Sequence, residues 1–244
     1  MELLTIATGL LRDPVALIDG PDERGTLARL APSLLAITVL GAAVFGVVVG
    51  SYRGGVQVVY AAIKMPALLL LPVVVSLPAV RALLQAGGLQ VSYSRVALAC
   101  LAGAARTAIL TAALGPVVWL YYSITPDYHA SVLVMALALG LAGLPGMATV
   151  SRAVIPADDG SSVAGRSRLR WLSAVGILLV MGLTGAQSGW LLRPFVARPT
   201  AEIAFLRPIE EDVFSSLAAT SRSARGDYRG WEAEAEGLLS KEAP

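Results

Sequence analysis

Long apolar stretches alternate with short polar ones along the chain, and this pattern predicts five membrane-spanning helices. Each apolar stretch holds about 20 residues, the length of helix that crosses the hydrocarbon core of a bilayer. No Asp or Glu occurs between Glu23 and Asp127 or between Asp159 and Glu202. A charge at mid-bilayer costs at least about 2.5–3.5 kcal/mol, so acid-free stretches favour spans. The predicted spans are residues 30–50, 65–84, 96–122, 130–150 and 171–192.

The spans divide the chain into three parts. Residues 1–29 form an amphipathic N-terminal segment, residues 30–193 the five-span domain, and residues 194–244 a tail outside the membrane. In the tail, the segment RPIEEDVF places a proline before three acids, which is typical of the first turn of a helix. We therefore expect short helices in the tail.

The stretch GGVQVVYAAIKM between the first two spans is amphipathic. Helical spacing places Val56, Val59, Tyr60 and Ile63 on one face. We expect a short helix over residues 52–64 that lies in the membrane interface. The alternative is that these residues extend the second span.

Composition supports an all-α integral membrane bundle. The chain is 56% hydrophobic and 15% charged, with a mean hydropathy of +0.70, whereas soluble domains carry roughly a quarter charged residues. A net charge of +2 without a basic run argues against a nucleic-acid partner. Cys100 is the single cysteine, and no metal or cofactor site is expected. Seventeen arginines, two lysines and abundant alanine and glycine suggest a bacterial inner-membrane protein.

The short loops predict the orientation. Arg81 and Arg95 flank the loop between the second and third spans, and four arginines lie between the fourth and fifth. Basic residues concentrate in cytoplasmic loops. The N-terminus is therefore expected in the cytoplasm and the tail in the periplasm. Arg53 and Lys64, at the opposite end, argue against this orientation.

Arg106 lies within the third span, where ionisable groups are candidate functional sites. Three interpretations are open. The side chain extends toward the cytoplasmic face or contacts carbonyls freed by a proline; it contacts another helix or a partner; or it lines a transport path. We expect a structural role, because no span contains a carboxylate to pair with it.

Small residues recur at four-residue spacing, which permits close helix packing in lipid. The pairs are Gly46–Gly50, Ala108–Ala112 and Gly185–Gly189, and packing within the chain is the expected use. GLAGLPG, residues 140–146, is interpreted as a kink near the end of the fourth span rather than an unwound ion site.

Signatures of catalysis are nearly absent, and we expect no enzyme. The sequence contains neither HExxH nor GxSxG nor a phosphate-binding glycine loop. His129, the single histidine, lies beside Asp127 in a short turn and has no well-placed nucleophile.

The most specific local motif is GAQSGWLLRPF, at the end of the fifth span. Trp190 and Arg193 fit the transition from lipid to water, followed by Pro194 and Phe195, while Gln187 places an amide inside the span. These residues and Arg106 are the candidate interaction or structural residues.

Three stretches resemble a family of uncharacterised bacterial multi-span membrane proteins. They are AAIKMPALLLLPVVVSLPAV, LGPVVWLYY and QSGWLLRPF, within a similarity over residues 50 to 215. The span count alone is similar to Yip1-type five-span proteins. These resemblances imply an architecture and no catalytic residue.

The absence of catalytic motifs, the small-residue faces and the amphipathic tail favour a non-catalytic scaffold or anchoring subunit. Its expected partners are membrane lipids and other membrane or membrane-associated proteins. The alternative is a transporter or channel for a small solute or ion, with a path near Arg106. A polar cavity reaching Arg106 favours transport, and a closed apolar bundle favours the scaffold.

Overall fold

The structure is a computed structural model that describes residues 2–125, 127–155, 164–196 and 205 of the chain. All regular structure in these residues is helical. The helices are α1 (Glu2–Arg12), α2 (Pro14–Ile18), α3 (Glu23–Ser51), α4 (Val56–Ala86), α5 (Tyr93–Ile124), α6 (Tyr128–Val154) and α7 (Ala164–Leu191).

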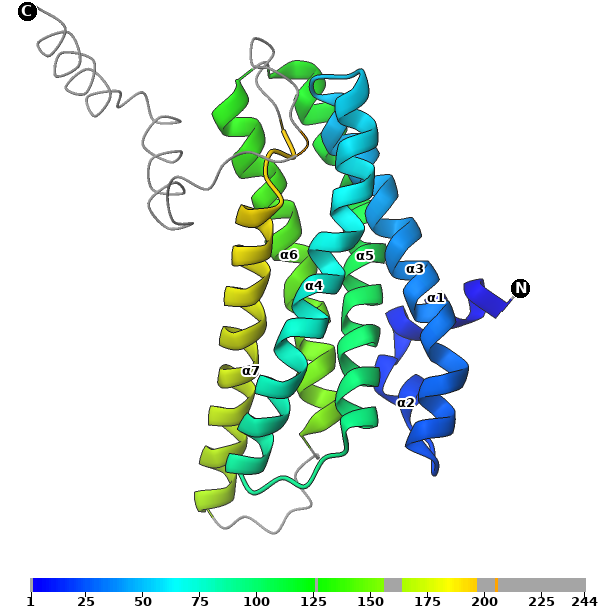
Figure 1. The fold of residues 1–244 in the computed structure, drawn as a ribbon, viewed down its shortest axis with the longest axis vertical. Coiled ribbons are helices and arrows are strands. Elements are labelled where there is room, and N and C mark those ends of the chain that lie inside the picture. The colour runs from blue at the N-terminus through cyan, green and yellow to red at the C-terminus, as the bar shows by residue number, and fades with distance from the viewer. Residues whose placement is uncertain (1, 126, 156–163, 197–204, 206–244) are drawn as a thin grey trace, which may run out of the picture.

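Five of these helices, α3 to α7, are long and apolar enough to cross a membrane. They cover the predicted spans, and the prediction of an all-α membrane bundle is confirmed. The chain is a multi-pass membrane protein. Helix α5 packs against α3, α4 and α6, whereas α7 packs mainly on α4 (Figure 1).

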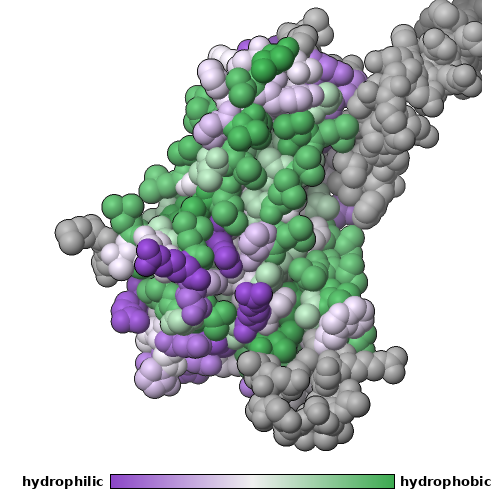
Figure 2. Space-filling model, turned by 180° about the vertical axis from the view of Figure 1, so that it is seen from behind, coloured by the Kyte–Doolittle hydropathy of each residue, from purple (hydrophilic) through white to green (hydrophobic). Residues whose placement is uncertain are grey.

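The bundle has two chemically different ends. Helices α3, α5 and α7 begin at the arginine end, which is named here for Arg81, Arg95 and Arg152 on α4, α5 and α6. They finish at the tyrosine end, named for Tyr52, Tyr122 and Tyr128. On the face seen in Figure 2, hydrophobic side chains cover most of the surface between the ends, and hydrophilic side chains gather in the lower part.

Polar caps start several helices outside the apolar stretches. Asp22 accepts a hydrogen bond from Arg24 N at 3.1 Å, and Ser92 accepts one from Arg95 N at 3.0 Å. Such caps satisfy backbone N–H groups that the first helical turn leaves unpaired. The helices therefore extend beyond the spans that hydropathy alone predicts.

Residues 56–64 are the first part of α4, which is one helix through Ala86. This corrects the expectation of a separate interfacial helix over residues 52–64, and the structure has the alternative arrangement. The exposed positions include Val56, Val59 and Ile63. Apolar side chains on the outer face of a spanning helix contact lipid. The exposed apolar face at the start of α4 therefore fits a helix that crosses the membrane.

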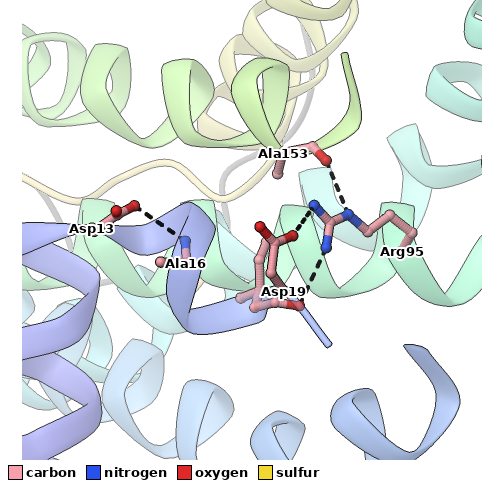
Figure 3. A network of polar contacts seen from close by, with 6 residues as sticks. Asp13, Ala16, Asp19, Arg95 and Ala153 are labelled. Atoms are coloured by element: carbon pink, nitrogen blue, oxygen red, sulfur yellow. Dashed lines mark hydrogen bonds and ion pairs between the residues drawn. The ribbon is translucent and has the colours of Figure 1, made fainter. Parts of the chain in front are cut away.

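The N-terminal segment packs on the bundle toward the arginine end. Arg95 on α5 donates through Nε to Ala153 O at 2.9 Å and through Nη1 to Ile18 O at 3.2 Å. Its Nη2 lies 2.6 Å from Asp19 Oδ1. Figure 3 shows the guanidinium between Asp19, which follows α2, and Ala153 near the end of α6. One side chain thus joins three helices at this end.

Candidate functional site

Helix α4 carries two buried polar side chains near the tyrosine end. Gln57 and Lys64 are seven residues apart, which is two helical turns, and therefore share a face. Their exposed fractions are 0% and 1%, respectively. Close packing brings this part of α4 against α3. A Cβ added at Gly46 would lie 2.5 Å from Ala61 O, so only glycine permits this approach.

Both side chains bind the segment that follows α7. Gln57 Nε2 donates to the carbonyl oxygens of Pro194 and Phe195 at 3.1 and 2.8 Å. Lys64 Nζ donates to Pro194 O at 3.1 Å. These carbonyls belong to no helix, and a buried backbone oxygen without a donor is costly. We call Gln57, Lys64 and residues 194–196 the latch.

The latch segment also fills part of the apolar core. Phe195 and Val196 are 5% and 3% exposed. They belong to a core cluster with Phe45 of α3, Met65 of α4 and Val118 of α5. In Figure 1 the chain leaves α7 and turns in between α6 and α4. Residues 194–196, expected to begin an external tail, lie inside the bundle instead. The remaining tail falls outside the described residues, apart from Phe205.

Aromatic rings complete the surroundings of Lys64. Its Nζ lies 4.8 Å from the ring centroid of Phe205 and 6.0 Å from that of Phe195. Phe205 also packs edge-on against Tyr60 at 5.1 Å between centroids. An ammonium over aromatic rings gains electrostatic stabilisation, which increases where water is excluded. The ammonium is thus held by a carbonyl and by rings.

The other residues of the exit motif have different environments. The Arg193 guanidinium stacks on Trp190 with Cζ 3.4 Å from the ring centroid, as suits a cation and an indole near the interface. Gln187 is exposed on α7. Of the six candidate residues, the structure therefore brings Pro194 and Phe195 into the latch and leaves Gln187 on the surface.

Arg106 contacts a neighbouring helix. Its Nη1 donates to Thr149 Oγ1 of α6 at 3.0 Å, and that hydroxyl donates in turn to Pro145 O at 3.0 Å. Thr149 lies five residues before the end of α6, at the arginine end. The structure does not bring Arg106 and Gln187 together, because Gln187 lies near the tyrosine end of α7.

The contact between α5 and α6 is tight beside Arg106. A Cβ added at Gly103 would lie 2.8 Å from Gly146 O, and one added at Gly146 would collide with Thr107. Helix α6 continues through GLAGLPG without unwinding. Gly140 and Gly143 have no neighbouring atom within 4 Å of an added Cβ. Gly146 therefore permits close packing of α6 against α5, whereas Gly140 and Gly143 face open space.

Asp127 acts as a helix cap. Its Oδ1 accepts hydrogen bonds from the backbone N of His129 and Ala130 at 2.8 and 3.4 Å. Asp127 and His129, predicted to lie in a turn, are thus the N-cap and a first-turn residue of α6. Their two-residue spacing reflects capping geometry.

Gln57 and Lys64 are the site residues that sequence reasoning did not identify. The available signal is their seven-residue spacing, which places them together on a different face from Val56, Val59 and Ile63. In a membrane helix, polar residues on one face indicate the side turned to protein.

Comparison with protein-family models, curated proteins and solved structures found no significant match. Over the described residues, the fold defines the class: a helical membrane protein with five helices able to cross a bilayer.

Proposed function

We propose that this protein is a non-catalytic scaffold or anchoring subunit of a complex in a bacterial inner membrane. The latch carries the proposal. Gln57 and Lys64 bind the carbonyls of Pro194 and Phe195, and the Phe195 ring packs in the core, so the chain after residue 196 starts from a fixed place. A segment that starts from a fixed place loses less freedom when a partner binds it, and this favours association.

The charges at the two ends support an orientation. Arg81, Arg95 and Arg152 lie at the arginine end, and the start of α7 adds three more arginines, Arg166, Arg168 and Arg170. The positive-inside rule then places the arginine end and the N-terminus in the cytoplasm, and the residues after the latch in the periplasm.

The alternative, a transporter or channel with a path near Arg106, has less support. Gly103 and Gly146 bring α5 and α6 into direct backbone contact one turn from Arg106. The Arg106 side chain is bonded to Thr149 at that same contact. A transport path needs a polar passage, and close backbone contact leaves little space for one between these helices.

The test compares three forms of the full-length chain, extracted gently with lipids from their own host and examined by native mass analysis. Gln57→Leu/Lys64→Met removes both donors and leaves two buried carbonyls unpaired, at a cost of about 1–3 kcal/mol each. Lys241→Met removes the other lysine and is the matched control.

We expect the wild type and Lys241→Met to carry the same stoichiometric partner subunit and the double variant to lose it. A wild-type chain that is always alone or only self-associated would contradict the scaffold function. Equal retention by the double variant would contradict the role given to the latch.

A further inference from the structure

We propose that Arg106 binds the phosphate of an anionic phospholipid from the leaflet at the arginine end. One hydrogen bond holds the Arg106 guanidinium in place, and most of its N–H donors remain available for a ligand. Arginine has five N–H donors, and the described residues provide one hydrogen bond, from Nη1 to Thr149 Oγ1. Since the Thr149 hydroxyl donates to Pro145 O, its oxygen is the acceptor for Arg106.

The charge of Arg106 has no protein counter-ion among the described residues. The ion pair found there joins Arg95 to Asp19 and leaves Arg106 out. By sequence, no Asp or Glu lies between Glu23 and Asp127, which includes all of α5 up to its end. An uncompensated charge within a span is costly. The neutralising anion is therefore expected from the surroundings of the bundle.

The half-buried position of Arg106 gives the direction of access. On the inner side, Gly103 and Gly146 close the contact between α5 and α6. The exposed part of Arg106 therefore faces outward, where the bilayer lies. Side chains on a helix lean toward its N-terminus, and α5 begins at the arginine end. The bond to Thr149 follows this direction, and five residues of α6 span about 7.5 Å to the helix end.

A phosphate is the anion that fits this place. The guanidinium fork matches two phosphate oxygens, and such charge-assisted pairs are stronger than neutral ones. Arg152 is exposed one turn beyond Thr149 on α6 and adds a second positive charge toward the headgroup layer. Basic sites between spans are a recurrent mode of binding anionic lipid headgroups.

The experiment measures lipid retention by native mass spectrometry of the full-length chain. The probe is an equimolar mixture of phosphatidylglycerol and phosphatidylcholine in mild detergent. We expect the wild type to retain one phosphatidylglycerol in preference to phosphatidylcholine. Arg106→Gln should lower that preference about tenfold, which corresponds to about 1.4 kcal/mol. Arg152→Gln should lower it less than Arg106→Gln. Arg24→Gln, which removes an exposed arginine at the same end, is the matched control and should leave the preference unchanged.

Two further variants keep the test valid if Arg106→Gln does not fold. Arg106→Lys keeps the charge without the fork, and Thr149→Val removes the hydroxyl that holds the guanidinium. Both should retain the lipid more weakly than the wild type. Equal retention of the two lipids by the wild type, or an unchanged preference in folded Arg106 and Thr149 variants, would overturn the proposal. Displacement of the lipid by millimolar inorganic phosphate would identify a site for free phosphate instead.

Discussion

The bundle holds its two terminal segments with basic side chains at opposite ends, and the two attachments differ in how the cation is satisfied. Arg95 at the arginine end has a carboxylate, Asp19, and two carbonyl partners. Lys64 at the tyrosine end has one carbonyl and aromatic rings in the described structure. The Arg95 side chain is 16% exposed, whereas Lys64 is 1% exposed. The attachment through Arg95 is stabilised by several polar contacts near water, whereas the attachment through Lys64 depends on packing in the core.

The largest effect is expected from Phe195→Ala. Removing a buried aromatic side chain leaves a cavity and typically costs about 3–5 kcal/mol. Because Phe195 anchors the latch, the segment should leave the bundle and expose Lys64. The measurement is modification by a water-soluble amine reagent in mild detergent, located by mass spectrometry.

Lys241 is the internal reference for this measurement, since the chain has two lysines. Phe205→Ala is the matched control, because Phe205 contacts Lys64 but is 43% exposed. We expect a smaller rise in labelling for Phe205→Ala. Rapid labelling of Lys64 in the wild type would contradict the latch as described.

A smaller effect is expected from Arg95→Gln. This change removes the ion pair with Asp19 and weakens the bonds to Ala153 and Ile18, and hydrogen bonds to charged groups are worth about 1.5–3 kcal/mol. Amide exchange in α2 should become faster while exchange in the centre of α5 is unchanged. Arg24→Gln, an exposed arginine at the same end, should leave α2 protected. Unchanged exchange in Arg95→Gln would show that packing alone holds the segment.

The smallest effect is expected from Asp19→Asn. The Asp19 side chain is 58% exposed, and exposed ion pairs contribute about 0–1 kcal/mol. The variant should raise α2 exchange slightly, and added salt should reduce the difference from the wild type. An effect as large as that of Arg95→Gln would mean that the carboxylate, and not the carbonyls, dominates this attachment.

The spans were predictable from sequence because each is a local property of about 20 residues. Hydropathy identified all five helices, and small residues identified close contacts such as that of Gly46 and Gly50 with α4. The helix ends were harder to predict from the sequence, because caps such as Asp22 and Ser92 lie outside the apolar stretches. The prolines within α4 did not divide it into separate helices.

The latch was not predictable in the same way, because it joins residues about half a chain apart. QSGWLLRPF has the composition of a membrane exit, and Trp190 and Arg193 fit that interpretation. The burial of Phe195 depends on Gln57 and Lys64, which lie far away in sequence. The amphipathic pattern at the start of α4 predicts a helix that lies in the membrane interface. In the bundle, the polar face of this helix is turned to protein.

The separation of these partners has a consequence for biosynthesis. Lys64 precedes Pro194 by 130 residues, and bacterial and eukaryotic ribosomes add roughly 5–20 residues per second. Helix α4 is therefore made several seconds before the backbone carbonyls that its ammonium binds. During this interval Lys64 requires water, a lipid headgroup or the insertion machinery as a temporary partner. Closure of the latch then marks a chain in which α7 has been translated and has packed on the bundle.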